Sequence, residues 1–169
     1  MMNAFKLSMI NFDQSLFYNT YNKLLVDLSF REIFKEYFIP LLQELGYLWQ
    51  SNTISTTHEH FITNLVKQKV YTNTEKVHRS EYVNNKSFVL FLPENEIHEL
   101  GILYLNYELN LRGYKSIFLG QSVPIENLEP LIASNEFVEF IAYVKVEPSK
   151  EKIDKYLQKF KKKILDKKD

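Results

Sequence analysis

The apolar stretch Ser87-Phe88-Val89-Leu90-Phe91-Leu92 is followed by the run Glu96-Ile97-His98-Glu99-Leu100-Gly101, and a helical pattern then extends from Leu100 to Leu111. This order predicts a buried strand that leads into a helix, with the imidazole of His98 at the carboxyl end of the strand. In open α/β sheets, ligands bind beyond that end of the strands. The sequence therefore places His98 where it can reach a ligand, although an ordinary polar residue at the start of a helix would give the same pattern.

Strands and helices continue to alternate beyond this stretch. We expect a strand over residues 116–119, a helix from Pro124 to about Ala133, a strand over 137–146 and a helix over 149–165, while Gly113 ends the helix that begins at Leu100. Alternation of this kind indicates right-handed strand-helix-strand crossovers and a parallel sheet. The second part of the chain is therefore predicted to be an α/β domain.

The first part of the chain has a different pattern. Between Phe12 and about Val77 the apolar residues recur at helical spacing, in three groups over residues 17–25, 33–45 and 61–70. This predicts a small helical bundle. The polar segment over residues 80–86 has the composition of a linker, so we expect a helical domain over residues 1–79 and an α/β domain over residues 80–169.

Local signals refine the second helix of the predicted bundle. Ser29 and Glu32 have the spacing of a capping box at its start. Pro40 predicts a kink within it, and Gly46 suits its C-terminal end.

Composition excludes several classes of function. The chain has 169 residues, of which 45% are apolar, with a formal net charge of zero and no cysteine. Disulfides, thiolate metal sites and thiol nucleophiles are therefore excluded, and without a signal-like N-terminus or a bilayer-length apolar run we expect a cytoplasmic protein with no membrane contact. The balanced charge argues against a nucleic-acid surface. Only Lys159 to Lys168 is strongly basic, which a solvated face of a terminal helix explains as well as a polyanion site does.

Two motifs together resemble a known family. The spacing Glu96-x-His98-x-x-Gly101 after a strand is similar to the Asp-x-His-x-x-Gly motif of cobalamin-binding domains. Upstream, Trp49 is followed ten and eleven positions later by Glu59 and His60. That pattern resembles the helical cap that precedes the cobalamin domain in light-sensing and related MerR-like transcription regulators. The resemblance covers roughly Phe12 to Val146 and implies a helical cap followed by a Rossmann-like (flavodoxin-like) parallel sheet.

The resemblance implies roles for residues of the α/β part. His98 would be the lower ligand of the cobalt in cobalamin, with Glu96 holding its other ring nitrogen. Gly101 would let the nucleotide tail or the corrin approach the helix closely. Gln121 and Ser122 lie in a segment similar to the Leu-Gly-x-x-x-Pro pattern of the family and would contact the tail.

The resemblance also implies roles for the helical part. Trp49 would shield the upper face of the corrin and the space of an adenosyl or methyl group, which Glu59 and His60 would also approach. Without the resemblance, Trp49 would be core packing, and Glu59 and His60 an exposed polar pair near a helix N-terminus. His58 adds a possible zinc ligand, but the spacing His-Glu-His differs from that of His-Glu-x-x-His zinc sites.

The sequence also departs from the family. Asn52 stands where the cap usually has Gly, and the strand Ala142-Tyr143-Val144-Lys145-Val146 lacks the usual Ser-x-Leu segment. No Gly-Gly turn follows it, so we expect a C-terminally shortened domain. Tyr143 or Lys145 would obstruct the nucleotide tail, and cobalamin binding is then expected to be weak or lost.

The implied function is that of a cobalamin-binding sensory or effector module of a MerR-like transcriptional regulator, and not that of an enzyme. The cofactor would be adenosyl- or methylcobalamin, and the signal a ligand-dependent change in the arrangement of cap and sheet or in oligomerisation. The chain as it stands has no winged helix-turn-helix, so we expect no direct DNA binding. The unpaired side of the strand over residues 137–146 predicts a second copy or a regulator subunit as partner. The alternatives are a corrinoid carrier for methyl transfer and a degenerate protein-interaction module.

Overall fold

The computed structural model describes residues 1–51, 53–133 and 137–166. These form two compact units, Met1–Lys69 and Val70–Asp169, which are described separately. No helix in these ranges is both long enough and apolar enough to cross a membrane.

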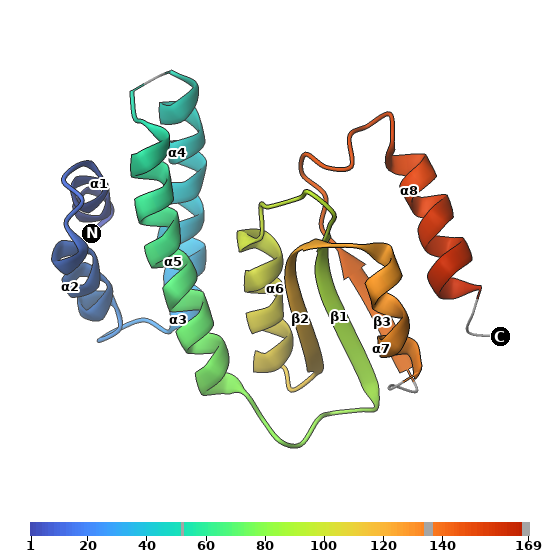
Figure 1. The fold of residues 1–169 in the computed structure, drawn as a ribbon. Helices are drawn as coiled ribbons and strands as arrows, with labels where there is room; N and C mark the ends of the chain where they lie inside the picture. Colours follow the sequence, from blue (N-terminus) through green and yellow to red (C-terminus); the bar gives the residue numbers. More distant parts are fainter. Residues whose placement is uncertain (52, 134–136, 167–169) are drawn as a thin grey trace. The chain divides into compact units, whose positions relative to one another are not determined.

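The first unit is a helical bundle, as the apolar spacing predicted (Figure 1). Its elements are α1 (Met2–Ile10), α2 (Gln14–Leu24), α3 (Phe30–Ile33), the π-helical turn η1 (Phe34–Phe38), α4 (Ile39–Gln50) and the first part of α5 (Thr56–Val77). Phe5, Phe17 and Phe38 form its fully buried aromatic centre, with ring centroids 5.2 to 5.9 Å apart. Helix α1 was not predicted, because its apolar residues do not keep to one face: Phe5 is buried whereas Leu7 is exposed.

The predicted capping box at the start of α3 is confirmed. The hydroxyl of Ser29 accepts a hydrogen bond from the backbone N–H of Glu32 at 3.3 Å, and the carboxylate of Glu32 accepts one from the N–H of Ser29 at 2.8 Å. These bonds satisfy two N–H groups that the first turn of a helix leaves without partners.

The prediction that the helix ends at Gly46 was wrong. Helix α4 continues to Gln50, because a single glycine inside a helix costs only about 1 kcal/mol and the packing of Leu41 and Leu45 outweighs that cost. The expected irregularity at Pro40 takes the form of η1, a wider turn just before the proline, which lacks an N–H and crowds the carbonyl four residues earlier. Asn52, the expected departure from the family pattern, lies outside the described residues.

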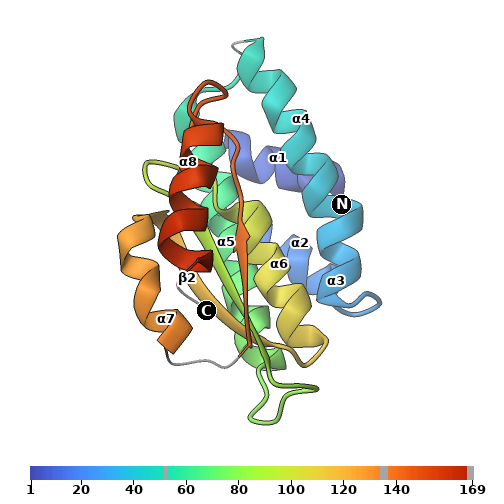
Figure 2. The same ribbon diagram turned by 90° about the vertical axis from the view of Figure 1, so that its right-hand side faces the viewer.

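The second unit is a three-layer α/β structure. Its sheet contains β1 (Lys86–Pro93), β2 (Lys115–Val123) and β3 (Phe137–Ala142) in the order β2-β1-β3, with both pairs parallel as predicted. Helix α6 (Leu100–Leu111) covers one face, and α7 (Glu129–Ala133) and α8 (Ile153–Phe160) cover the other (Figures 1 and 2). The remaining elements are the 3-10 turn η2 (Ile125–Leu128) and the π-helical turn η3 (Lys161–Leu165).

Side chains of the central strand β1 are buried on both faces of the sheet. Val89 and Phe91 pack with Ile125, Leu128 and Ile164 on the α7–α8 face. Leu90 and Leu92 pack with Ile102 of α6 on the opposite face. Because both faces of such a strand are buried, its sequence is a continuous apolar run. The strand was predicted from this run.

Some element bounds differ from the predicted ones. Strand β2 is longer than expected, and the helix expected from Pro124 begins one residue later as η2. Strand β3 ends at Ala142 and not at Val146, and α8 begins at Ile153 and not at residue 149. The early end of β3 has a physical cause: its partner strand β1 ends at Pro93, and the backbone of residues 145–147 beyond it binds a buried carboxylate.

Candidate functional site

The buried carboxylate belongs to Glu96, in the loop that follows β1. Its side chain is 0% exposed. Oε1 accepts hydrogen bonds from the backbone N–H groups of Ile97 and His98, at 2.9 and 3.0 Å, and lies 2.6 Å from Nδ1 of the His98 ring. Glu96 therefore holds both the backbone and the imidazole of His98.

The second oxygen of Glu96 is bound by the loop that follows β3. Oε2 accepts from the backbone N–H groups of Lys145, Val146 and Glu147, at 2.9, 2.5 and 3.0 Å. Three consecutive N–H groups converging on one oxygen form an anion-binding nest. The carboxylate thus joins two loops at the carboxyl edge of the sheet.

These contacts fix the charge of Glu96. Burial alone would raise the pKa of its carboxyl, but the hydrogen bonds from Val146, His98 and Glu147 outweigh that effect and hold the pKa well below its usual range. An ionised carboxylate can only accept hydrogen bonds, so the bonded Nδ1 of His98 carries a hydrogen. Neutral His98 therefore has its lone pair on Nε2, the arrangement of a metal-binding histidine.

Exposed apolar side chains flank His98, whose own side chain is 40% exposed. Ile97 and Val146 are 60% and 56% exposed. Both donate their backbone N–H to Glu96, which brings the two residues to the same edge as the imidazole. The surroundings of Nε2 therefore suit a partner with a broad apolar surface.

Gly101 lies in the first turn of α6, but the space beside it is taken. A Cβ at this position would lie 3.7 Å from the ring of Tyr143, the first residue after β3. The backbone N–H of Tyr143 donates to the carbonyl of Phe91 at 3.3 Å. Tyr143 therefore lies in ordinary van der Waals range of this position, and its predicted obstruction of a nucleotide tail stays a prediction.

Ser122 and Gln121 lie in the last part of β2, and both are exposed. The hydroxyl of Ser122 accepts from the backbone N–H of Asn95 at 3.0 Å, and its own N–H donates to the carbonyl of Glu96 at 3.2 Å. Ser122 therefore holds the Glu96 loop in place. Sequence reasoning missed this contact and the nest after β3, because neither follows from a local pattern.

The three predicted residues of the first unit lie on α4 and α5. Trp49 is 55% exposed near the end of α4, so it is not core packing. Nδ1 of His60 lies 2.9 Å from Oε2 of Glu59, and Oε1 of Glu59 accepts a hydrogen bond from the hydroxyl of Thr63 at 3.0 Å. The imidazole of His60 and the carboxylate of Glu59 therefore contact each other directly.

His58 is engaged elsewhere. Its Nδ1 lies 2.7 Å from the hydroxyl of Ser55, and its ring stacks on Phe12 with centroids 4.7 Å apart. Across the described ranges, no group of three or more His, Asp or Glu side chains is placed to hold a metal ion.

The Glu96 contacts predict a pH-dependent contribution to stability. Glu96→Gln replaces one carboxylate oxygen with an NH₂ group, which cannot accept the hydrogen bonds of the nest, so the free energy of unfolding at neutral pH should fall by about 2–4 kcal/mol. Because the folded-state pKa is lowered, this contribution is present above the unfolded-state pKa of about 4.3 and is lost as the pH falls below it. Chemical denaturation between neutral pH and pH 3 measures it.

The difference in the free energy of unfolding between the wild type and Glu96→Gln should therefore become smaller as the pH is lowered. Glu94→Gln, an exposed change in the same loop, is the matched control and should have little effect at either pH. A difference in the free energy of unfolding that stays constant with pH would contradict the assignment of Glu96 as an ionised carboxylate.

Known proteins are similar to this chain in sequence and in fold. Residues 1–72 match the family model described as B12 binding domain. Trp49, Glu59 and His60 lie within this matched range. The chain is 28% identical over 117 residues to the HTH-type transcriptional repressor CarH of Myxococcus xanthus. That alignment covers 69% of this chain and 38% of the repressor, so the chain spans less than two thirds of its relative's length.

A solved structure shares the fold. The monomethylamine corrinoid protein of Methanosarcina barkeri superimposes with a TM-score of 0.70 at 13% identity, over 95% of this chain and 77% of that protein. This likeness confirms the predicted helical region followed by a Rossmann-like parallel sheet. The resemblance to cobalamin-binding domains is confirmed as well: the N-terminal region matches the B12 binding domain model, and the chain is similar to an HTH-type transcriptional repressor.

Proposed function

We propose that this chain is a cobalamin-binding effector module in which Nε2 of His98 is the lower ligand of cobalt. The observation that carries the proposal is the bond between Glu96 and His98, since it fixes the tautomer that leaves Nε2 free to ligate. The family match and the relation to a transcriptional repressor support it.

The residues around His98 fit such a ligand in part. The exposed side chains of Ile97 and Val146 would lie against the corrin, and Glu96 would raise the basicity of the imidazole. A bound cobalamin supplies a cobalt ion that can carry an alkyl group. The fit is less good beside Gly101, where Tyr143 narrows the space for a nucleotide tail. We propose no chemical step for the chain itself.

The first test is ligation by His98. The wild-type chain, mixed with hydroxocobalamin in the dark and desalted, should stay red and show a spectrum of histidine-ligated cobalt. His98→Ala should lose this spectrum because no other side chain is proposed to ligate. The control is His78→Ala, a change in the same unit just after α5. An unchanged spectrum in His98→Ala would rule out the assignment.

A second test concerns Tyr143. Tyr143→Ala should strengthen the binding of cobalamin by about tenfold, equivalent to about 1.4 kcal/mol, because it opens the space beside Gly101 for the nucleotide tail. Cobinamide has no nucleotide tail, so its affinity should change much less. Calorimetric titration of both ligands measures the difference. Equal changes for the two would show that Tyr143 does not restrict the tail.

The roles proposed for Trp49, Glu59 and His60 are contacts with the upper ligand of cobalt. Because Trp49 is exposed, Trp49→Ala should change the free energy of unfolding by no more than about 0.5 kcal/mol. Retention of methylcobalamin should nevertheless fall more than that of hydroxocobalamin, since the methyl group would lose its apolar cover.

The matched control for Trp49 is Tyr47→Ala, since Tyr47 lies on the same helix and is 72% exposed. It should leave the retention of both cobalamins unchanged. If Trp49→Ala unfolds the protein or weakens both cobalamins equally, the role of Trp49 is structural.

Signalling would use a partner. The outer side of β3 pairs with no strand of the described ranges, so it suits a second copy or a regulator subunit. A change in oligomeric state on cobalamin loading supports the effector role over that of a corrinoid carrier. Failure of the intact chain to retain any corrinoid would favour a protein-interaction module.

A further inference from the structure

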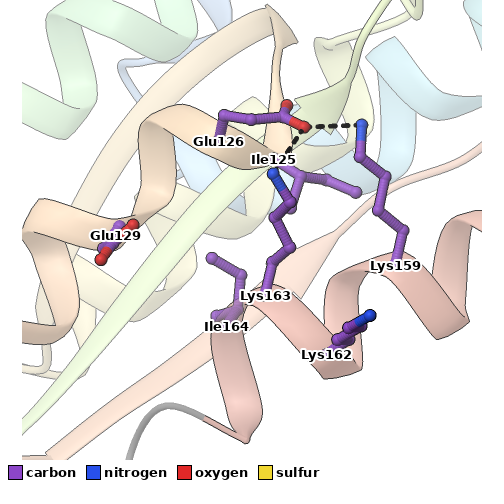
Figure 3. A pocket seen from close by; sticks show the side chains of 7 residues that line it. All are labelled: Ile125, Glu126, Glu129, Lys159, Lys162, Lys163 and Ile164. Carbon is purple, nitrogen blue, oxygen red and sulfur yellow. Dashed lines mark ion pairs between the residues drawn. The ribbon is translucent and has the colours of Figure 1, made fainter.

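A cavity lies on the α7–α8 face of the sheet, in the layer opposite α6. Its volume is about 430 Å³, which is within the usual size of small-molecule sites (Figure 3). Residues from η2, α7, α8 and η3 line it: Ile125, Glu126, Glu129, Lys159, Lys162, Lys163 and Ile164. The proposed role of His98 leaves this cavity unexplained.

The cavity combines an apolar side with a cationic one. Ile125 and Ile164 are 3% and 1% exposed and belong to the core of this face. The three lysines come from one helical segment, with Lys162 and Lys163 in consecutive positions of η3. A ligand with an anionic end and a short apolar part would match both sides.

The lysines offer more hydrogen-bond donors than their carboxylate partner accepts. Oε1 of Glu126 lies 2.8 Å from Nζ of Lys159 and 3.4 Å from Nζ of Lys163, so one oxygen serves two ammonium groups (Figure 3). Each ammonium has three N–H donors. Lys162 makes no ion pair with the acidic residues of the cavity.

The carboxylate of Glu126 is an anion that lies between Lys159 and Lys163. The hydrogen bond from Lys159 is the main reason that the pKa of its carboxyl falls to about 2, so it is charged at neutral pH. An oxyanion that enters the cavity would meet the same ammonium groups and would compete with Glu126 for them.

A buried hydroxyl nearby lacks a partner. The hydroxyl of Tyr156 is buried and has no hydrogen-bond partner among the described residues. Its ring packs on the cluster that contains Ile125 and Ile164, the two apolar residues of the cavity. Burial raises the pKa of Tyr156 to about 12, so the hydroxyl remains a donor at neutral pH. Tyr156 itself does not line the cavity, so its hydroxyl belongs to the apolar layer next to it.

We propose that this cavity binds a small phosphate-bearing molecule, with the phosphate held by Lys159, Lys162 and Lys163 and an apolar part against Ile125 and Ile164. A phosphate offers several acceptor oxygens and up to two negative charges, which matches three ammonium groups better than a single carboxylate does. The site is separate from His98 and does not depend on cobalamin.

The test is titration of the full chain with inorganic pyrophosphate, followed by backbone amide NMR and calorimetry. Saturable shifts are expected in Ile125–Leu128 and in the helical segment that carries the lysines, and added salt should weaken binding. Lys162→Gln should weaken binding at least about fivefold, because it removes a charged donor from the cavity. Glu126→Gln should strengthen binding, because it removes the competing carboxylate.

The matched control is Lys155→Gln, a charge change on α8 outside the cavity. It should alter the affinity for pyrophosphate less than twofold, since only long-range attraction is lost. Equal weakening by Lys155→Gln and Lys162→Gln would show general attraction to a basic helix and would overturn the proposal. Binding to phosphatidylglycerol vesicles without saturable binding of pyrophosphate would also overturn it, because a lipid surface would then be the partner.

Discussion

The buried carboxylate of Glu96 is the interaction on which the carboxyl edge of the sheet depends. Desolvating an ionised carboxylate is costly, and the cost is tolerated only because both oxygens are surrounded by donors: Ile97 and His98 on one side, and the backbone of residues 145–147 on the other. Removing those donors would leave a buried charge. The two loops are therefore held together by a charge that neither could bury alone.

This interaction also directs the chain beyond the sheet. Ala142 pairs with Phe91 and β1 ends at Pro93, so residues 145–147 lie past the end of the strand beside them, and their N–H groups bind Glu96. The turn carries Tyr143 over Gly101. One carboxylate thus fixes the tautomer of His98, while the loop that binds this carboxylate also places Tyr143 beside the first turn of α6.

The carboxyl edge of the sheet and its α7–α8 face carry different side chains. The loops at the edge present an imidazole among exposed apolar side chains, whereas the α7–α8 face presents lysines above a buried apolar layer. In the first unit, the exposed indole of Trp49 contrasts with the buried rings of Phe5, Phe17 and Phe38. An aromatic side chain left outside a well-filled aromatic core suggests a contact with something other than that core.

The sequence by itself determined the features that depend on local pattern. The apolar run of β1, the bounds of α6, the capping box at Ser29 and the place of His98 after a parallel strand all follow from residues a few positions apart, since helix and strand periods and caps are short-range. Three features were decided only by the tertiary structure. They are the continuation of α4 beyond Gly46, the contact of Tyr143 with Gly101 and the hydrogen bond from the backbone of Asn95 to Ser122. The nest around Glu96 joins residues 50 positions apart. Such contacts depend on which backbone groups lack a partner once the sheet has formed, and no local pattern encodes that.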